Sequence, residues 1–87
     1  MPVAPLYNDG KYAEAAERTR ELAAAHPQLP MLVYMLACCQ SKAGHTEAAL
    51  EALRAATVTR RMRMIAAKDP DLDAIRDEPA FAEIIDD

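Results

Sequence analysis

Apolar side chains recur along much of the chain with the period of an α-helix. Leu32, Met35, Leu36 and Cys39 follow the spacing i, i+3, i+4, i+7, which gathers them on one face of a helix. This pattern predicts a helix over residues 31–43 with those four side chains buried.

Proline and small residues set the bounds of the neighbouring helices. The residue before a proline is pushed out of helical geometry, so a helix over residues 11–25 should end at His26-Pro27. Pro30 then suits the first turn of the next helix. A further helix is expected over residues 46–58. Its buried side is predicted to consist of Ala49, Leu50, Leu53 and Ala56.

The last third of the chain changes character. Residues 60–68 form a short basic amphipathic pattern. An acidic residue followed by proline occurs at 69–70 and again at 78–79, and this pair gives a helix both a cap and a suitable first residue. Brief helices are therefore predicted over 71–76 and 80–85. Their apolar residues are Leu72, Ile75, Phe81, Ile84 and Ile85.

The chain also contains an internal repeat of 34 residues. Sliding the sequence by this length places Gly10 on Gly44 and Ala15 on Ala49. Glycine ends a helix in the left-handed conformation without steric cost. Each glycine is therefore expected at the corner of a helix-turn-helix.

This period and these small residues resemble the tetratricopeptide repeat family over roughly residues 6 to 60. The family pattern of W-x2-L-G-x2-Y, A-x3-F and P is met in part by Val33-x2-Leu36-Ala37-x2-Gln40, by Ala49-x3-Leu53, and by Ala15 and Pro27 with Thr19 in place of the aromatic residue. The resemblance implies an all-α fold of antiparallel helix-turn-helix repeats, a fragment of a right-handed solenoid. A single domain over 1–87 would hold an incomplete first repeat (6–29), a second repeat (30–59) and capping helices (60–87).

The resemblance also implies a site and a partner. Tetratricopeptide proteins bind extended peptides or helices along a concave face lined by their first helices. In this chain that face implies a partner-binding set of Met31, Tyr34, Cys38, Ser41 and Lys42. The alternative is that Tyr34 and Met31 only cover the core or the missing helix of the first unit. Lys42 alone matches the family's basic clamp for chaperone tails, which argues against that ligand.

The first unit is incomplete, because only residues 6–9 remain for its first helix and two prolines in the first five residues disfavour a longer one. At least three repeat-like units are normally needed for stability. We therefore expect an open N-terminal edge, around Leu6, Tyr7, Tyr12 and the face of Met31 and Tyr34, that packs against a second copy in a homodimer or against a preceding domain.

Composition narrows the function classes. The 87 residues are 52% hydrophobic with a net charge of −4, and this acidic balance argues against nucleic-acid binding. The longest mainly apolar stretch, 29–39, is too short to cross a membrane. The first residues lack the pattern of a secretory signal. These features predict a cytoplasmic protein with no nucleic-acid or membrane partner.

Charge is also unevenly placed. Residues 54–68 carry five basic and no acidic side chains, whereas residues 69–87 carry eight acidic and one basic. Two interpretations stay open: compensation between neighbouring helices, or a basic surface for an acidic partner or phosphate group.

Candidate chemistry is sparse. Cys38 and Cys39 are adjacent, so a mutual disulfide would be strained and reduced thiols are expected. Neither they nor His26 and His45 form a nucleophile–base motif or the ligand spacing of a zinc site. No enzymatic activity, cofactor or metal is predicted.

A bacterial protein-interaction scaffold is the favoured function, and the alternative is an accessory or oligomerisation domain of a larger bacterial enzyme or cupin-like protein.

Overall fold

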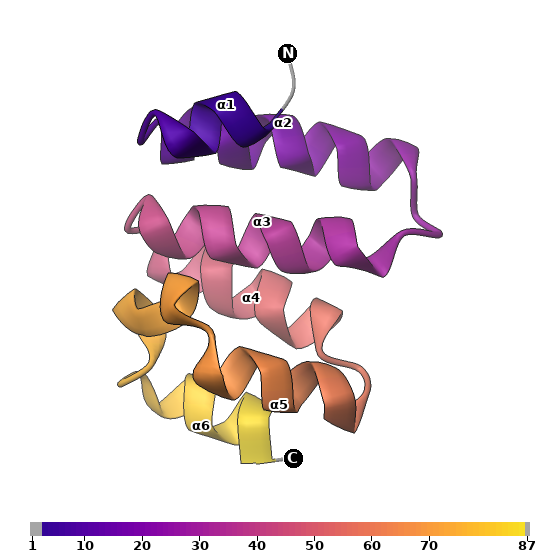
Figure 1. Ribbon diagram of the computed structural model, residues 1–87. Coiled ribbons are helices and arrows are strands. Elements are labelled where there is room, and N and C mark those ends of the chain that lie inside the picture. The colour runs from indigo at the N-terminus through magenta and orange to yellow at the C-terminus, as the bar shows by residue number, and fades with distance from the viewer. Residues whose placement is uncertain (1–2, 87) are drawn as a thin grey trace.

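The computed structural model describes residues 3–86, and within them the chain forms seven helices and no strand. The predicted all-α class is confirmed. The helices run from α1 and α2 at one end to α5 and α6 at the other, and η1, which follows α5 in the sequence, folds back onto α3 (Figure 1). Their bounds are α1 Val3–Asn8, α2 Tyr12–Ala25, α3 Pro30–Lys42, α4 Thr46–Ala56, α5 Arg60–Lys68, the 3-10 helix η1 Pro70–Ile75 and α6 Pro79–Asp86.

The bounds predicted from α2 onward agree with the structure to within two residues. The N-terminal prediction was wrong, because α1 begins at Val3 rather than at residue 6. Pro5 lies in the first turn of this helix, where the backbone N–H groups have no partner within the helix. A proline there removes no helical hydrogen bond, so its presence does not shorten α1.

The two glycine turns are closed in the same way. Gly10 and Gly44 have φ angles of 78° and 82°, a left-handed conformation that favours glycine. At each turn the residue after the glycine donates its backbone N–H to the carbonyl five residues earlier. These bonds join Lys11 to Leu6 and His45 to Gln40, each at 2.9 Å. Each turn directs the chain back along the preceding helix, which produces the α1–α2 and α3–α4 hairpins.

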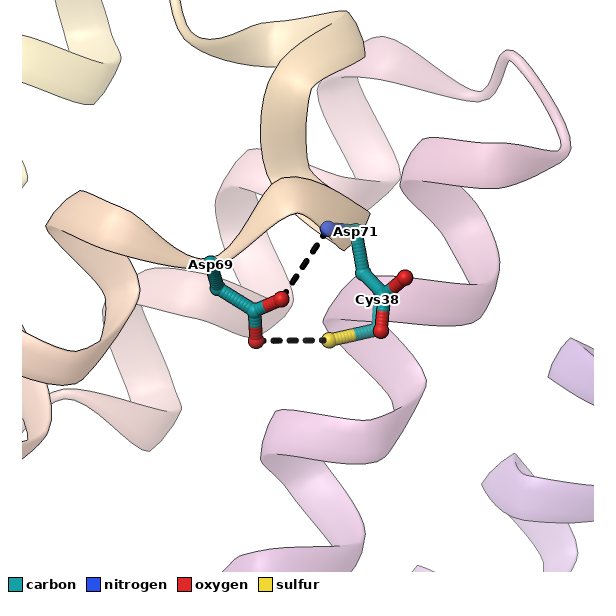
Figure 2. A group of neighbouring side chains, drawn as sticks. All are labelled: Cys38, Asp69 and Asp71. Carbon is teal, nitrogen blue, oxygen red and sulfur yellow. Dashed lines mark hydrogen bonds between the residues drawn. The ribbon is translucent and has the colours of Figure 1, made fainter.

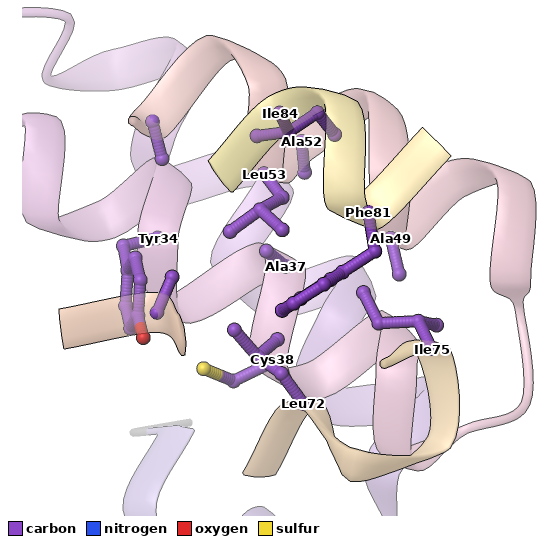
Figure 3. Packing of buried hydrophobic residues seen from close by; sticks show 12 residues of the cluster. Tyr34, Ala37, Cys38, Ala49, Ala52, Leu53, Leu72, Ile75, Phe81 and Ile84 are labelled. Carbon is purple, nitrogen blue, oxygen red and sulfur yellow. The ribbon is translucent and has the colours of Figure 1, made fainter. Parts of the chain in front are cut away.

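The central helix α3 packs against α2 on one side and against α4 and η1 on the other. Two apolar clusters result. The smaller joins α1, α2 and α3 through Leu6, Ala15, Ala16 and Cys39. The larger joins α3 and α4 to the C-terminal helices, with Leu72, Ile75 and Phe81 gathered around Ala37 and Leu53 (Figure 3). The C-terminal segment is therefore part of the core.

Arg76 fixes η1 to the end of α5. Its guanidinium donates hydrogen bonds to the backbone carbonyls of Ala67 and, at 2.6 Å, Asp69. The same group lies 5.5 Å from the centre of the Phe81 ring. Because the last carbonyls of a helix lack partners within it, this side chain satisfies α5 while it positions η1.

Two burial predictions were wrong. Met35, expected in the core, is 41% exposed, and Leu6, expected on an open edge, is only 6% exposed. The buried residues of α3 are instead Tyr34 and residues 37–41. The run 37–41 goes right round the helix, because α2, α4 and η1 all pack on α3. Leu6 belongs to α1, which packs on α2, and its side chain is buried against Ala15, Ala16 and Cys39.

No helix within residues 3–86 combines the length and the apolar character needed to cross a membrane.

Leu53 tests the larger core cluster, since its side chain is fully buried there. Leu53→Ala is expected to lower the free energy of unfolding by about 2–5 kcal/mol, because it removes buried methyl groups and leaves a cavity. Val58→Ala, at a site that is 73% exposed, is the control and should cost less than about 0.5 kcal/mol. Urea denaturation followed by circular dichroism measures both, and equal costs would contradict this core.

Candidate functional site

A pocket of about 340 Å³ opens between α1, α3 and the start of η1, and we call it the α3 pocket. Its walls are largely apolar and come from Tyr7, Met31, Tyr34 and Met35. Its polar groups come from Asn8, Cys38, Asp69 and Asp71. Met31 is 61% exposed, and with Met35 it places two thioether side chains in a region open to solvent.

The carboxylate of Asp69 organises the polar side of the α3 pocket. One oxygen, Oδ1, accepts the backbone N–H of Asp71 at 3.0 Å, which caps η1. The other, Oδ2, accepts the hydroxyl of Tyr34 at 2.7 Å. The thiol of Cys38 also points at Oδ2, with 3.9 Å between the atoms (Figure 2). One carboxylate therefore joins η1 to the middle of α3.

Cys38, Asp69 and Asp71 form a compact group, with one potential ligand atom from each lying within 4.8 Å of the others (Figure 2). Burial raises the pKa of the Cys38 thiol from its ordinary value of 9.0 to about 12, and the charges of the two carboxylates add to the effect. The thiol is therefore protonated at neutral pH. A protonated thiol is a poor nucleophile and a poor metal ligand.

The two tyrosines of the α3 pocket are also held neutral. Burial is the main cause of the raised pKa of the Tyr34 hydroxyl, followed by its hydrogen bond to Asp69. Burial and the nearby Asp71 likewise raise the pKa of Tyr7. The Tyr7 hydroxyl oxygen is shielded from solvent and lies near Asp71, but no hydrogen bond of normal geometry joins the two groups.

Lys42 lies beside Asp71. Its ammonium nitrogen is 4.0 Å from Asp71 Oδ1 and 5.9 Å from the centre of the Tyr12 ring. Tyr12 in turn packs edge-on against Tyr7, with 5.1 Å between ring centres. Among residues 3–86 no ion pair involves the Asp69 carboxylate. The α3 pocket thus has two carboxylates and a cation that is paired with one of them.

Tyr7 and Tyr34 both line the α3 pocket. The sequence analysis placed both at the open N-terminal edge, and it also placed Tyr34 on the predicted partner face. Tyr34 and Cys38 are buried, with η1 packed on their helix. For Tyr34 this placement matches the alternative that it covers the core.

The other predicted binding residues fall in different environments. Met31 and Lys42 are exposed, whereas Ser41 is almost fully buried and its surface role has no support. Asp69 and Asp71 were missed as site residues, because the Asp-Pro pair was interpreted only as a helix cap. The signal for them was present in the excess of acidic residues directly after a basic segment.

Comparisons with protein-family models, with curated proteins and with solved structures give no match to this chain.

The bond between Tyr34 and Asp69 can be tested by deleting one hydroxyl. Tyr34→Phe is expected to lower the free energy of unfolding by about 1 kcal/mol, because it leaves a partly buried carboxylate with one donor fewer. Tyr12→Phe, whose hydroxyl makes no hydrogen bond within residues 3–86, should be close to neutral. Urea titration measures both variants, and an equal effect would contradict the role of this bond.

Because the Cys38 thiol is buried, we expect the free energy of unfolding to fall at alkaline pH. Its folded pKa lies above its ordinary value, so above pH 9 the thiol ionises in the unfolded chain before it ionises in the folded one. The stability that the buried, protonated thiol contributes is fully present below pH 9 and is lost as the pH rises toward 12. From pH 8 to pH 10 the free energy of unfolding should fall by about 1 kcal/mol less in Cys38→Ser than in the unmodified chain. Identical pH profiles in urea titrations would count against this burial.

Proposed function

We propose that this chain is a helical protein-interaction module that binds a short segment of a partner protein in the α3 pocket. The observation that carries the proposal is the pair Met31 and Met35, two exposed apolar side chains beside a pocket lined by tyrosines. Exposed apolar surface next to a pocket is characteristic of interaction sites. Methionine adapts its shape to varied partners, and tyrosine offers both an apolar ring and a polar end.

The resemblance to tetratricopeptide repeats supports the same proposal. The two glycine turns, 34 residues apart, are closed by equivalent hydrogen bonds, and each joins two antiparallel helices. In that family the first helix of a unit lines the binding face, which corresponds to α3 here. Because η1 packs on α3, a narrow pocket remains where a long groove would otherwise run. The expected ligand is therefore a short segment, held by one or two inserted side chains.

Binding is favoured over catalysis because of the state of the polar groups. The Cys38 thiol and both tyrosine hydroxyls have raised pKa values, which is the opposite of the activation a nucleophile needs. Two adjacent thiols kept free fit a cytoplasmic setting.

A second candidate is an oligomerisation or accessory domain of a larger protein. It is favoured by a different surface, where Val58, Met64 and Ile65 are exposed at and near α5. The homodimer predicted through the N-terminal edge is less favoured, because Leu6 is already buried against α2 and α3 within the chain.

Selection from a library of random peptides displayed on phage tests the proposal. The purified chain should enrich peptides that share a motif, and Met31→Glu combined with Met35→Glu should weaken their binding by about tenfold or more, since charge is placed beside an apolar pocket. Val58→Glu is the matched control, because it places the same charge on an exposed apolar residue outside the pocket. Circular dichroism confirms that each variant is folded.

Two outcomes would contradict the proposal. One is a selection that enriches no peptide. The other is a set of enriched peptides that bind the unmodified chain and the methionine variant equally well. Peptides that lose affinity only on Val58→Glu would instead favour the surface around α5.

A further inference from the structure

We propose that the α3 pocket recognises a lysine side chain of the partner, with its alkyl stem against the methionine and tyrosine walls and its ammonium group at Asp71 and Asp69. This inference rests on the proposed function, because it names the group that the pocket would accept. It follows from the charge of the pocket, from its shape and from the hydrogen bonds already made there.

The charge of the α3 pocket favours a cation. Asp69 and Asp71 contribute two carboxylates, while the thiol and the hydroxyls around them are neutral at physiological pH. Lys42 pairs with Asp71 at 4.0 Å, and the charge of Asp69 has no ion-pair partner within residues 3–86. Charges attract more strongly in a partly buried pocket than in water. A cationic group entering the pocket would complete its charge balance.

The walls favour a cation that has an apolar stem. The side chains of Met31, Met35, Tyr7 and Tyr34 line the same pocket as the two carboxylates. A lysine side chain buries its methylene groups along such surfaces while it keeps its charged end solvated or paired. Aromatic ring faces also attract cations.

The available acceptors favour lysine over arginine. Both oxygens of Asp69 already accept hydrogen bonds, from Asp71, Tyr34 and Cys38. Arginine is recognised best by a carboxylate with two free oxygens in one plane. An ammonium group has three donors that point in different directions, and these suit separate acceptors, such as one oxygen of Asp71 and one of Asp69.

A bare metal ion fits less well. A volume of about 340 Å³ with apolar walls is far larger than an ion requires. Binding through Cys38 would also have to remove a proton that the buried thiol holds strongly. The experiment below therefore includes divalent metal ions as competitors of the lysine probe.

Nuclear magnetic resonance of the chain labelled with 13C at its methionine methyl groups tests the inference directly. The probe is Nα-acetyl-lysine N-methylamide, and its neutral counterpart is the same compound with the side-chain nitrogen acetylated. The signals of Met31 and Met35 should shift saturably with the charged probe, and the neutral compound should bind about tenfold more weakly. Met64, on α5, is the internal control and should not shift.

Two variants separate the role of charge from a change in folding. Asp71→Asn should weaken the charged probe about fivefold or more, because it removes a carboxylate and leaves the backbone N–H that Asp69 accepts. Asp73→Asn, an exposed position on the same helix, should leave affinity unchanged. Lys42→Gln should strengthen binding, because it removes the cation that pairs with Asp71.

Three results would overturn the inference: equal affinity for the charged and neutral probes, no effect of Asp71→Asn, or displacement of the lysine probe by micromolar Zn2+ or Mg2+. The phage selection distinguishes this failure from failure of the proposed function. Enriched peptides that lack lysine but depend on Met31 and Met35 would support the interaction module and contradict the recognition of lysine.

Discussion

The carboxylate of Asp69 is the contact on which the C-terminal half of the molecule depends. It caps η1 through the N–H of Asp71 and accepts the hydroxyl of Tyr34 from the middle of α3. With the start of η1 fixed on α3, and with Arg76 holding η1 to the end of α5, Leu72 and Ile75 are directed into the core. Asp69 is thus both the cap of η1 and the residue that joins η1 to α3. The same hydrogen bonds form the polar side of the α3 pocket.

Helix positions could be predicted from the sequence because their signals are local. Prolines, two glycines and apolar spacing act within a few residues, and the bounds from α2 onward follow them closely. The start of α1 was missed because a proline in a first turn does not break a helix. Burial on α3 was only partly predicted, since Met35 is exposed and Ser41 buried. Periodicity shows that a helix has a buried face, but the width of that face depends on which neighbours pack on it.

The α3 pocket could not be predicted as a unit. Tyr34 and Asp69 are 35 residues apart in the chain, and no local pattern indicates that they meet. The resemblance to tetratricopeptide repeats directed attention to α3, which lines this pocket, but it offered no account of the C-terminal segment that packs on the same helix. The C-terminal segment contributes Asp69 and Asp71, and these two carboxylates give the otherwise largely apolar pocket its charge.

The adjacent thiols have a practical consequence of their own. Neighbouring residues on a helix point about 100° apart, so Cys38 faces the cluster shared with η1 and α6, while Cys39 faces the cluster shared with α1 and α2. Detachment of the C-terminal helices would uncover one sulfur, and detachment of the N-terminal hairpin would uncover the other. Two variants, each retaining only one of the cysteines, would therefore report local opening at different ends of the protein. The rate at which each thiol reacts with a disulfide reagent would show which end opens more readily.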